Sequence, residues 1–238
     1  MNLTTIFFDL DGTLLPMDED AFIRAYMKGL VKKLAPHGYE PEGLVKGIWT
    51  GVKAMYQNDG RCTNEEAFWQ AFAAVYGEKC RQDEGVFQEF YEKEFQEVQR
   101  DCGFNKAAAE VIAELRHMGL RLVLATNPLF PMIATHSRVR WAGLTPEDFV
   151  YISTYENSHY SKPNLKYYRE ILDRVGVPAE ECLMVGNNVE EDMITEQLGM
   201  KTFLCSDCLI NKQGKDISGY HQGGLTELLA YIKQLQGI

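Results

Sequence analysis

Short apolar runs recur along the chain, and most of them end in polar residues. Five of the runs are typical of buried strands: TTIFFD (4–9), LRLVLA (120–125), FVYI (149–152), CLMV (182–185) and TFLC (202–205). From residue 103 onward, helical patterns separate them, at 107–118, 129–142, 164–175, 188–198 and 225–236. Strands that alternate with helices of this length favour a parallel sheet with right-handed crossovers. The pattern predicts an α/β fold with a Rossmann-like, three-layer core.

Between the first and second of these strands the pattern is helical throughout. Candidate helices lie near 18–35, 41–58, 64–77 and 83–100. Thr63, followed by Glu66 three residues later, is typical of a capping box that opens the third helix. Because the sheet begins before this segment, we expect the segment to be an insertion. Residues 1–15 and 103–238 then form the core, and residues 16–102 form an all-α domain.

Composition and charge exclude several classes of partner. The chain has 238 residues, of which 45% are hydrophobic and 24% charged, as is ordinary for a globular protein. Its formal net charge of −10 is shared evenly between the insertion and the core, so no basic patch is available for nucleic acid. No apolar run is long enough to span a membrane, and the N-terminus lacks the basic region of a secretion signal. We therefore expect a cytoplasmic protein.

The six cysteines fit that compartment as reduced thiols. Cys205 and Cys208 form a lone C-x-x-C pair, and no cluster of cysteine or histidine supplies the other two ligands that a zinc site needs. We interpret the pair as structural, with a redox role as the alternative.

Polar residues collect where the predicted strands end. Asp9, Asp11, Gly12 and Thr13 follow the first strand, and Thr126 and Asn127 follow the second. The loop after FVYI carries Glu156, His159, Ser161 and Lys162, and CLMV is followed by Gly186, Asn187, Asn188 and Asp192. Ligands of open parallel sheets bind beyond the carboxyl ends of the strands. This convergence predicts a functional site at that edge.

The residue types at this edge indicate a chemistry. Asp9 and Asp11 are two residues apart on an extended segment, so their carboxylates repel unless a cation or a lysine joins them. Hard oxygen ligands favour Mg²⁺. With a metal present, one carboxylate can attack an electrophile while the other transfers protons. Gly12 allows a sharp turn whose amides can hold an anion.

These residues resemble a known family. FFDLDGTLL (7–15) closely resembles the first motif of the haloacid dehalogenase (HAD) superfamily of phosphohydrolases. Thr126 is similar to the second motif, Lys162 in SKPN to the third, and VGNNVEEDM (185–193) occupies the place of the fourth. The helical insertion resembles the α-helical cap of that family. The resemblance implies a Mg²⁺-dependent phosphatase that acts on a small phosphorylated metabolite.

The resemblance also implies a role for each residue. Asp9 is the expected nucleophile, which forms an aspartyl-phosphate, and Asp11 is the expected general acid and base. Thr126, with Asn127 nearby, is expected to bind the phosphoryl group, and Lys162 to offset charge repulsion. Mg²⁺ is expected on Asp9, the backbone carbonyl of Asp11, and the fourth-motif residues Asn187 and Asp192. Dehalogenating members lack an acid at the position of Asp11, so dehalogenation is the less suitable activity.

One position departs from the family pattern. The fourth motif usually begins Gly-Asp, whereas this chain has Asn187 after Gly186. A neutral amide oxygen attracts Mg²⁺ less strongly, although Glu191 can compensate electrostatically. Two alternatives stay open: a phosphomutase, and a binding or regulatory protein with little turnover. The sequence leaves the substrate and the oligomeric state open.

Other residues favour structural interpretations. Trp49, Trp69 and Trp141 lie on apolar helical faces, which indicates core positions, with a role in a pocket of the cap as the alternative. For His159 the favoured interpretation is a solvated loop residue, with substrate contact as the alternative. We expect the cap to select the substrate and to open near residues 14–20 and 100–105, where the chain passes between core and cap.

Overall fold

A computed structural model describes residues 3–237. Residues 1, 2 and 238, which belong to the predicted core, lie outside the described residues. The sheet is parallel, with strand order β3-β2-β1-β4-β5-β6. Its strands are β1 (Thr5–Phe8), β2 (Arg121–Leu124), β3 (Tyr151–Ile152), β4 (Cys182–Gly186), β5 (Lys201–Cys205) and β6 (Gln222–Gly223). The predicted α/β class is confirmed.

Alternate residues of the strands face two helical layers. On one face, Ile6 and Phe8 of β1 belong to a cluster with α6 (Lys106–His117), α7 (Met132–Trp141) and α9 (Leu225–Gln236). On the other face, Phe7 lies in a cluster with α8 (Leu165–Val175). Since side chains alternate along a strand, β1 can be buried on both faces. This gives the three-layer core that the pattern predicted.

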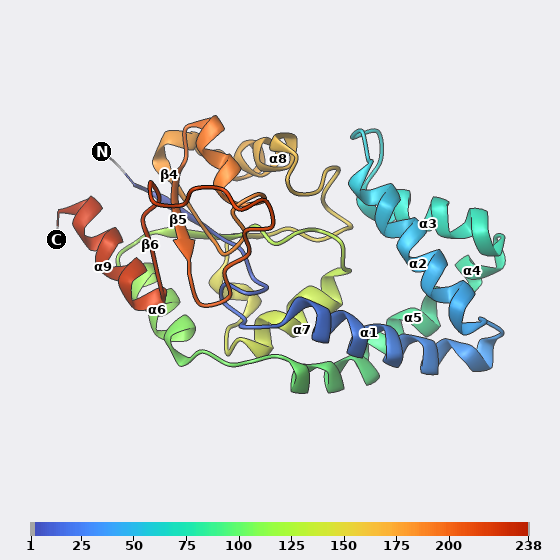
Figure 1. The fold of residues 1–238 in the computed structure, drawn as a ribbon. Coiled ribbons are helices and arrows are strands. Elements are labelled where there is room, and N and C mark those ends of the chain that lie inside the picture. Colours follow the sequence, from blue (N-terminus) through green and yellow to red (C-terminus); the bar gives the residue numbers. More distant parts are fainter. Residues whose placement is uncertain (1–2, 238) are drawn as a thin grey trace.

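The segment between β1 and β2 is helical, as predicted. It contains α1 (Glu19–Leu34), α2 (Pro41–Tyr56), α3 (Asn64–Tyr76), α4 (Lys79–Gln82) and α5 (Glu84–Glu92), with 3-10 helices at η1 (Ala35–His37) and η2 (Glu94–Asp101). These helices extend to one side of the sheet (Figure 1). The Thr63–Glu66 capping box is present at the start of α3.

Two of the contacts that hold the helical segment in place involve backbone carbonyl groups. Where the chain enters and leaves it, the Gly103 amide donates to the Pro16 carbonyl at 2.7 Å. At the start of α3, the buried Asn64 donates from Nδ2 to the carbonyl oxygens of Pro128 (3.3 Å) and Tyr160 (3.2 Å). The segment is therefore held against the loops that follow β2 and β3.

Several predicted elements are wrong in detail. The helix expected at 83–100 is interrupted at Lys93, whose backbone (φ −114°, ψ −80°) ends α5 and begins η2. The helix expected from 129 starts at Met132, because Pro131 adopts extended backbone. Only the second half of FVYI is a strand, after the 3-10 helix η3 (Pro146–Asp148). The two-residue strand β6 has no apolar run and was missed.

The helix predicted at 188–198 is also wrong. Residues 188–192 form a turn, and the 3-10 helix η5 (Met193–Leu198) follows it. A further 3-10 helix, η4 (Ala179–Glu181), precedes β4. Asn188 does act like a cap, because its Oδ1 accepts from the amides of Glu190 (3.0 Å) and Glu191 (3.1 Å). These bonds close a loop rather than start an α-helix.

Two of the three tryptophans are buried as predicted, and the third is not. Trp69 and Trp141 are 4% and 5% exposed, whereas Trp49 is 47% exposed. The prediction of a core position for Trp49 is therefore wrong. Among residues 3–237, no helix has the length and apolar character needed to cross a bilayer.

Candidate active site

The predicted site residues lie at one edge of the sheet. Phe8 of β1 is in register with Leu124 of β2 and with Val185 of β4. Asp9, Thr126 and Asn187 follow these three positions by one or two residues, so the parallel strands place them side by side. They line a common cavity of about 380 Å³ together with Asp11, Asn127 and Asp192. The structure thus brings together the residues that the sequence singled out.

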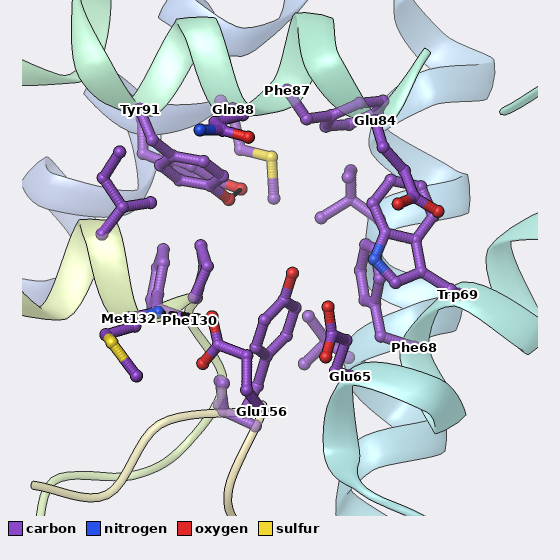
Figure 2. A pocket seen from close by; sticks show the side chains of 18 of the residues that line it. Glu65, Phe68, Trp69, Glu84, Phe87, Gln88, Tyr91, Phe130, Met132 and Glu156 are labelled. Carbon is purple, nitrogen blue, oxygen red and sulfur yellow. Dashed lines mark hydrogen bonds between the residues drawn. The ribbon is translucent and has the colours of Figure 1, made fainter. Parts of the chain in front are cut away.

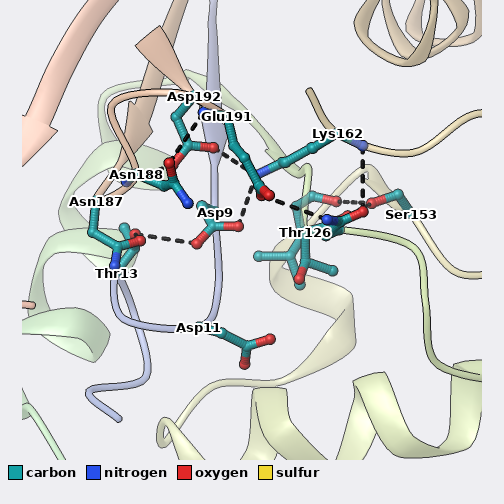
Figure 3. A network of polar contacts seen from close by, with 12 residues as sticks. Asp9, Asp11, Thr13, Thr126, Ser153, Lys162, Asn187, Asn188, Glu191 and Asp192 are labelled. Carbon is teal, nitrogen blue, oxygen red and sulfur yellow. Dashed lines mark hydrogen bonds and ion pairs between the residues drawn. The ribbon is translucent and has the colours of Figure 1, made fainter. Parts of the chain in front are cut away.

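Lys162 joins two carboxylates at the centre of the site. Its Nζ lies 2.8 Å from Asp9 Oδ1 and 2.6 Å from Asp192 Oδ1 (Figure 3). The lysine is 1% exposed. Burial alone lowers the pKa of its ammonium group, but Asp192 and Asp9 outweigh burial and hold that pKa well above its usual value. Lys162 therefore stays protonated and neutralises one of the two acids.

Asp192 is fully engaged in this arrangement. Besides the bond to Lys162, its Oδ2 accepts from the Asn188 amide at 3.0 Å. A Cβ at Gly186 would lie 2.1 Å from the same oxygen, so only glycine allows β4 to approach so closely. The fourth-motif acid is thus positioned chiefly to hold Lys162, and it would reach a metal only by sharing or releasing one of these bonds.

A second chain of contacts joins Asp9 to Asn187. Thr13 Oγ1 lies 3.3 Å from Asp9 Oδ2 and 3.2 Å from Asn187 Oδ1, so its single proton can be donated to either. Asn187 Nδ2 donates to the Cys208 carbonyl at 2.7 Å. A Cβ at Gly12, which has φ +81°, would lie 2.2 Å from that amide nitrogen. The turn after β1 therefore requires glycine, and the amide at 187 is orientated with its oxygen toward Thr13.

Asp11 lies apart from this network, and its partner is a residue that the sequence analysis missed. Arg138 of α7, 1% exposed, forms an ion pair with Asp11. The guanidinium carbon also lies 4.5 Å from the centroid of the Phe130 ring. Burial raises the pKa of Asp11 above its usual value, and Arg138 opposes that rise. In HSRVRW (136–141) no pattern distinguishes a buried arginine from exposed ones, so only the fold could identify Arg138.

Backbone and side-chain bonds fix the end of β2. The Thr126 carbonyl accepts from Ser153 Oγ (2.7 Å) and from the Tyr167 hydroxyl (2.8 Å), which fixes the strand end that carries the threonine side chain. Asn127 Oδ1 accepts from the Lys162 amide at 3.3 Å. Ser153 and Tyr167 carry no motif, and the sequence analysis did not identify them.

Asn127 also faces the helical segment and the fourth motif. Its Nδ2 lies 3.4 Å from the Tyr56 hydroxyl and 3.5 Å from Glu191 Oε2. Burial raises the pKa of Glu191 to about 7. Tyr56, at the end of α2, is one of the residues of the helical segment that line the candidate site.

His159 does not contact the site residues. Its Nδ1 lies 2.6 Å from Glu170 Oε1, and its side chain is 33% exposed. The histidine therefore joins its loop to α8, in a partly exposed position close to the solvated one that the sequence favoured.

The local charge determines what the cavity can bind. Six acids line it, at Asp9, Asp11, Glu19, Asp20, Glu191 and Asp192, and Lys212 is the one basic residue in the same lining. The ammonium group of Lys162 neutralises the charge of one acid, and the guanidinium group of Arg138 neutralises that of Asp11. A phosphate would meet a negative surface unless a cation accompanied it.

The donor atoms fit Mg²⁺ better than a softer metal. The side chains that line the site offer oxygen, from the carboxylates of Asp9 and Asp192 and from the amide of Asn187. Within residues 3–237 no three acids, histidines or cysteines are grouped to form a metal cage of their own. Mg²⁺ commonly uses one or two carboxylates and completes its shell with water and substrate phosphate. A site that includes the neutral Asn187 oxygen is consistent with that behaviour.

Comparison with known proteins identifies the family. The model of the haloacid dehalogenase-like hydrolases matches residues 3–195. Pyrophosphatase PpaX from Bacillus velezensis is 22% identical over 236 residues, which cover 99% of this chain and 97% of that protein. Glyceraldehyde 3-phosphate phosphatase from Methanocaldococcus jannaschii is 30% identical over 129 residues, or 53% of this chain and 55% of that protein.

Solved structures share the fold at low identity. A 2-haloacid dehalogenase from Pseudomonas syringae pv. Tomato DC3000 matches with a TM-score of 0.61 and 19% identity, covering 98% of this chain and 99% of that one. The magnesium-bound HAD-hydrolase YfnB from Bacillus subtilis matches with a TM-score of 0.57 and 20% identity over the whole of both chains. Since the family model spans the four motifs and most of the sheet, the chain belongs to the haloacid dehalogenase-like hydrolases.

Proposed function

We propose that this chain is a Mg²⁺-dependent phosphatase that acts on a small phosphorylated metabolite through an aspartyl-phosphate on Asp9. The arrangement of Lys162 between Asp9 and Asp192 carries the proposal. A protonated lysine beside a carboxylate lets that carboxylate approach an anionic phosphoryl group, because the lysine lowers the local negative charge. Two relatives with phosphatase names support the same reaction class.

The first half of the reaction follows from the two aspartates. Lys162 binds Asp9 Oδ1, which leaves Oδ2 as the attacking oxygen. Oδ2 forms a bond to phosphorus while the bond from phosphorus to the leaving oxygen breaks. Asp11, which lines the same cavity, gives its proton to that oxygen. The raised pKa of Asp11 favours this role, because the carboxyl can hold a proton closer to neutral pH.

The second half restores the enzyme. Asp11, now a carboxylate, accepts a proton from a water molecule that attacks phosphorus. The bond from phosphorus to Asp9 then breaks and releases inorganic phosphate. Thr126 and Asn127, at the end of β2, would bind the phosphoryl oxygens in both halves. Each step places charge where Lys162 or a bound cation can offset it.

Asp9, the Asp11 backbone carbonyl, Asn187 and Asp192 would hold Mg²⁺. The ion would supply charge neutralisation for the phosphoryl oxygens at this otherwise acidic edge. Asp11 also favours phosphate chemistry over dehalogenation, since a proton donor for the leaving oxygen is of use only in the former. A cytoplasmic location stays a prediction, in keeping with six free cysteines.

A hydrolysis screen tests the proposal. Purified protein with Mg²⁺ should release phosphate from an aryl phosphate and from members of a metabolite panel, and Asp9→Asn should abolish the release. Product analysis with a sugar phosphate would show whether the phosphoryl group moves within the substrate, as a mutase requires. Absence of hydrolysis across the panel by metal-loaded protein would contradict the proposal.

A further inference from the structure

A second cavity adjoins the catalytic one. It has a volume of about 460 Å³ and lies between the helical segment and the loops that follow β2 and β3. The two cavities share five wall residues: Ile23, Trp49, Val52, Leu129 and Phe130. A substrate whose phosphate lies beside Asp9 would therefore find the second cavity next to its organic part.

The walls of this cavity are aromatic to an unusual degree. Eight of its twenty lining residues are aromatic, among them Trp69, Phe87, Tyr91, Phe130 and Tyr155. Several rings meet edge to face, such as Trp69 and Phe87 with centroids 5.2 Å apart. The faces of such rings carry partial negative charge and attract cations.

Carboxylates complete the lining. Glu65, Glu84 and Glu156 reach the cavity from different sides (Figure 2), and the lining includes no lysine, arginine or histidine. Glu156 Oε1 accepts from the Met132 amide at 2.8 Å, whereas Glu156 Oε2 is buried with no hydrogen-bond partner among the described residues. A buried carboxylate oxygen without a donor is costly, so a ligand that donates a hydrogen bond to it would be stabilised there.

Glu65 also has carboxylate oxygens without a hydrogen-bond partner among the described residues. Within residues 3–237 its carboxylate forms no ion pair and no hydrogen bond. Burial raises the pKa of Glu65, and the nearby Glu156 raises it further. The two acids thus repel each other across a space that a cation would relieve.

One cationic side chain of the protein already binds at the wall of this cavity. Arg81 pairs with Glu84 at 2.9 Å, and its guanidinium carbon lies 5.4 Å from the centroid of the Trp69 ring. Arg81 forms no ion pair with Glu65 or Glu156, and its longer-range attraction for Glu65 is smaller than the effect of burial and of Glu156 on the pKa of Glu65.

We propose that the second cavity binds the organic part of the substrate, and that this part carries a cationic nitrogen on an apolar body. The proposal rests on the proposed phosphatase function and narrows its substrate to amine-bearing phosphomonoesters. The phosphate would lie beside Asp9, the apolar body against Trp49 and Phe130, and the cation between Glu65 and Glu156.

Binding to the Asp9→Asn protein tests the proposal without turnover. Calorimetry in the presence of Mg²⁺ would compare ω-aminoalkyl phosphates with n-alkyl phosphates of equal chain length. Once the chain is long enough to reach Glu65 and Glu156, the amine should bind at least about tenfold more tightly than its neutral match. Shorter pairs, whose amine stays in the first cavity, should differ less.

Variants test whether Glu65 and Glu156 cause the tighter binding of the amine. Glu65→Gln and Glu156→Gln, each made in the Asp9→Asn protein, keep size and hydrogen-bonding capacity but remove charge, so each should reduce the preference for the amine. Glu97→Gln is the matched control, because Glu97 is exposed in the same helical segment and does not line the cavity. It should keep the full preference.

The outcomes separate the two proposals. Equal binding of amine and neutral ligands at every chain length would overturn the cationic substrate, even if the wild-type protein hydrolyses an aryl phosphate. Tighter binding of sugar phosphates than of either series would overturn it as well, since the acids would then serve hydroxyl groups. A clear amine preference in a protein that hydrolyses no phosphate would support the ligand class and contradict the phosphatase function.

Discussion

Arg138 shows how a single residue outside any motif supports the site. It is buried with its charge directed at Asp11, so neither group can lose the other without leaving a charge in a poorly solvated place. The side chain of Asp11 is 24% exposed, which lets water screen part of the effect. The pair therefore matters less for net stability than for holding Asp11 ready for its proposed role.

Replacing Arg138 with Met, which keeps much of the volume, should lower the free energy of unfolding by about 3 kcal/mol, the lower end for a broken buried pair. Urea denaturation measures the loss. The double variant Arg138→Met with Asp11→Asn removes both charges and should be more stable than the sum of the single losses implies. Strictly additive losses would show that the two groups do not interact.

Asn187 is the residue at which the chain departs from the family pattern. In the structure its amide group also forms a hydrogen bond that an aspartate could not form. An aspartate there would offer Mg²⁺ a charged oxygen, but would lose the bond from Nδ2 to the Cys208 carbonyl. Metal-free Asn187→Asp should therefore be less stable than wild type by about 1–3 kcal/mol.

Added Mg²⁺ should raise the melting temperature of Asn187→Asp more than that of wild type, because tighter binding stabilises the folded state by mass action. Thermal melts over a magnesium titration give both effects. Asn188→Asp is the matched control, since Asn188 only accepts bonds through Oδ1 and a carboxylate can replace it. Unchanged metal affinity in Asn187→Asp would mean that residue 187 does not contact the ion.

At the residue scale the sequence was informative where chemistry dictates residue type. The sequence identifies four of the site residues because each follows a predicted strand at the position of a family motif: Asp9, Thr126, Lys162 and Asp192. Their bonding could not be foreseen. That Asp192 is engaged by Lys162, or that Thr13 lies between Asp9 and Asn187, depends on distances that only the packed sheet sets.

At the scale of elements, α1, α5 and η2 are joined by a surface ion-pair network. Lys33 of α1 lies 3.0 Å from Glu89 and 3.1 Å from Glu94, and Lys93 lies 2.7 Å from Glu89. The hydrogen bonds from Lys93 and Lys33 lower the pKa of Glu89 from 4.5 to about 2. A lowered carboxyl pKa stabilises the fold above the unfolded value, and this contribution is lost as pH falls toward the folded value.

The variant Glu89→Gln should thus unfold at a lower urea concentration than wild type at neutral pH. The difference in urea midpoint between this variant and wild type should disappear as pH falls from 4.5 toward about 2, and should become smaller in high salt. Glu97→Gln, which breaks no ion pair among the described residues, should match wild type throughout. A gap that stayed constant with pH would mean that the charge of Glu89 is not its cause.

The elements also show the limits of periodicity. Regular helices such as 107–118 and strands such as CLMV were predicted well, because their apolar spacing is set by burial on a defined face. The helix predicted at 188–198 was wrong, although Asn188 and the acids after it suit the start of a helix. Asp192 turns back to Lys162 and Asn188, and this bonding within the site overrides local propensity.

At the scale of the whole molecule, we expect the helical cap to admit substrate and then to close over it. The two crossings between core and cap run side by side, with Gly103 against Pro16. A Cβ at residue 103 would lie 3.0 Å from the Pro16 Cβ and 3.2 Å from its carbonyl oxygen. The crossings therefore have little room for an added methyl group.

We predict that Gly103→Ala lowers kcat and kcat/KM together by several-fold, because it disturbs the hinge rather than the site. Steady-state kinetics with a bulky phosphomonoester measure this. Gly85→Ala is the control, since a Cβ there meets no atom within 4 Å. Wild-type kinetics in both variants would place the hinge elsewhere or show that opening does not limit turnover.

The central claim is that Asp9 carries the phosphoryl group during turnover. Rapid acid quenching of the enzyme with Mg²⁺ and a hydrolysed substrate, followed by mass spectrometry of the peptides, tests it most directly. We predict one phosphoryl group on Asp9 during turnover, and none in Asp9→Asn. Phosphate release with no phosphorylated peptide at any time, or with the phosphoryl group on another residue, would contradict it.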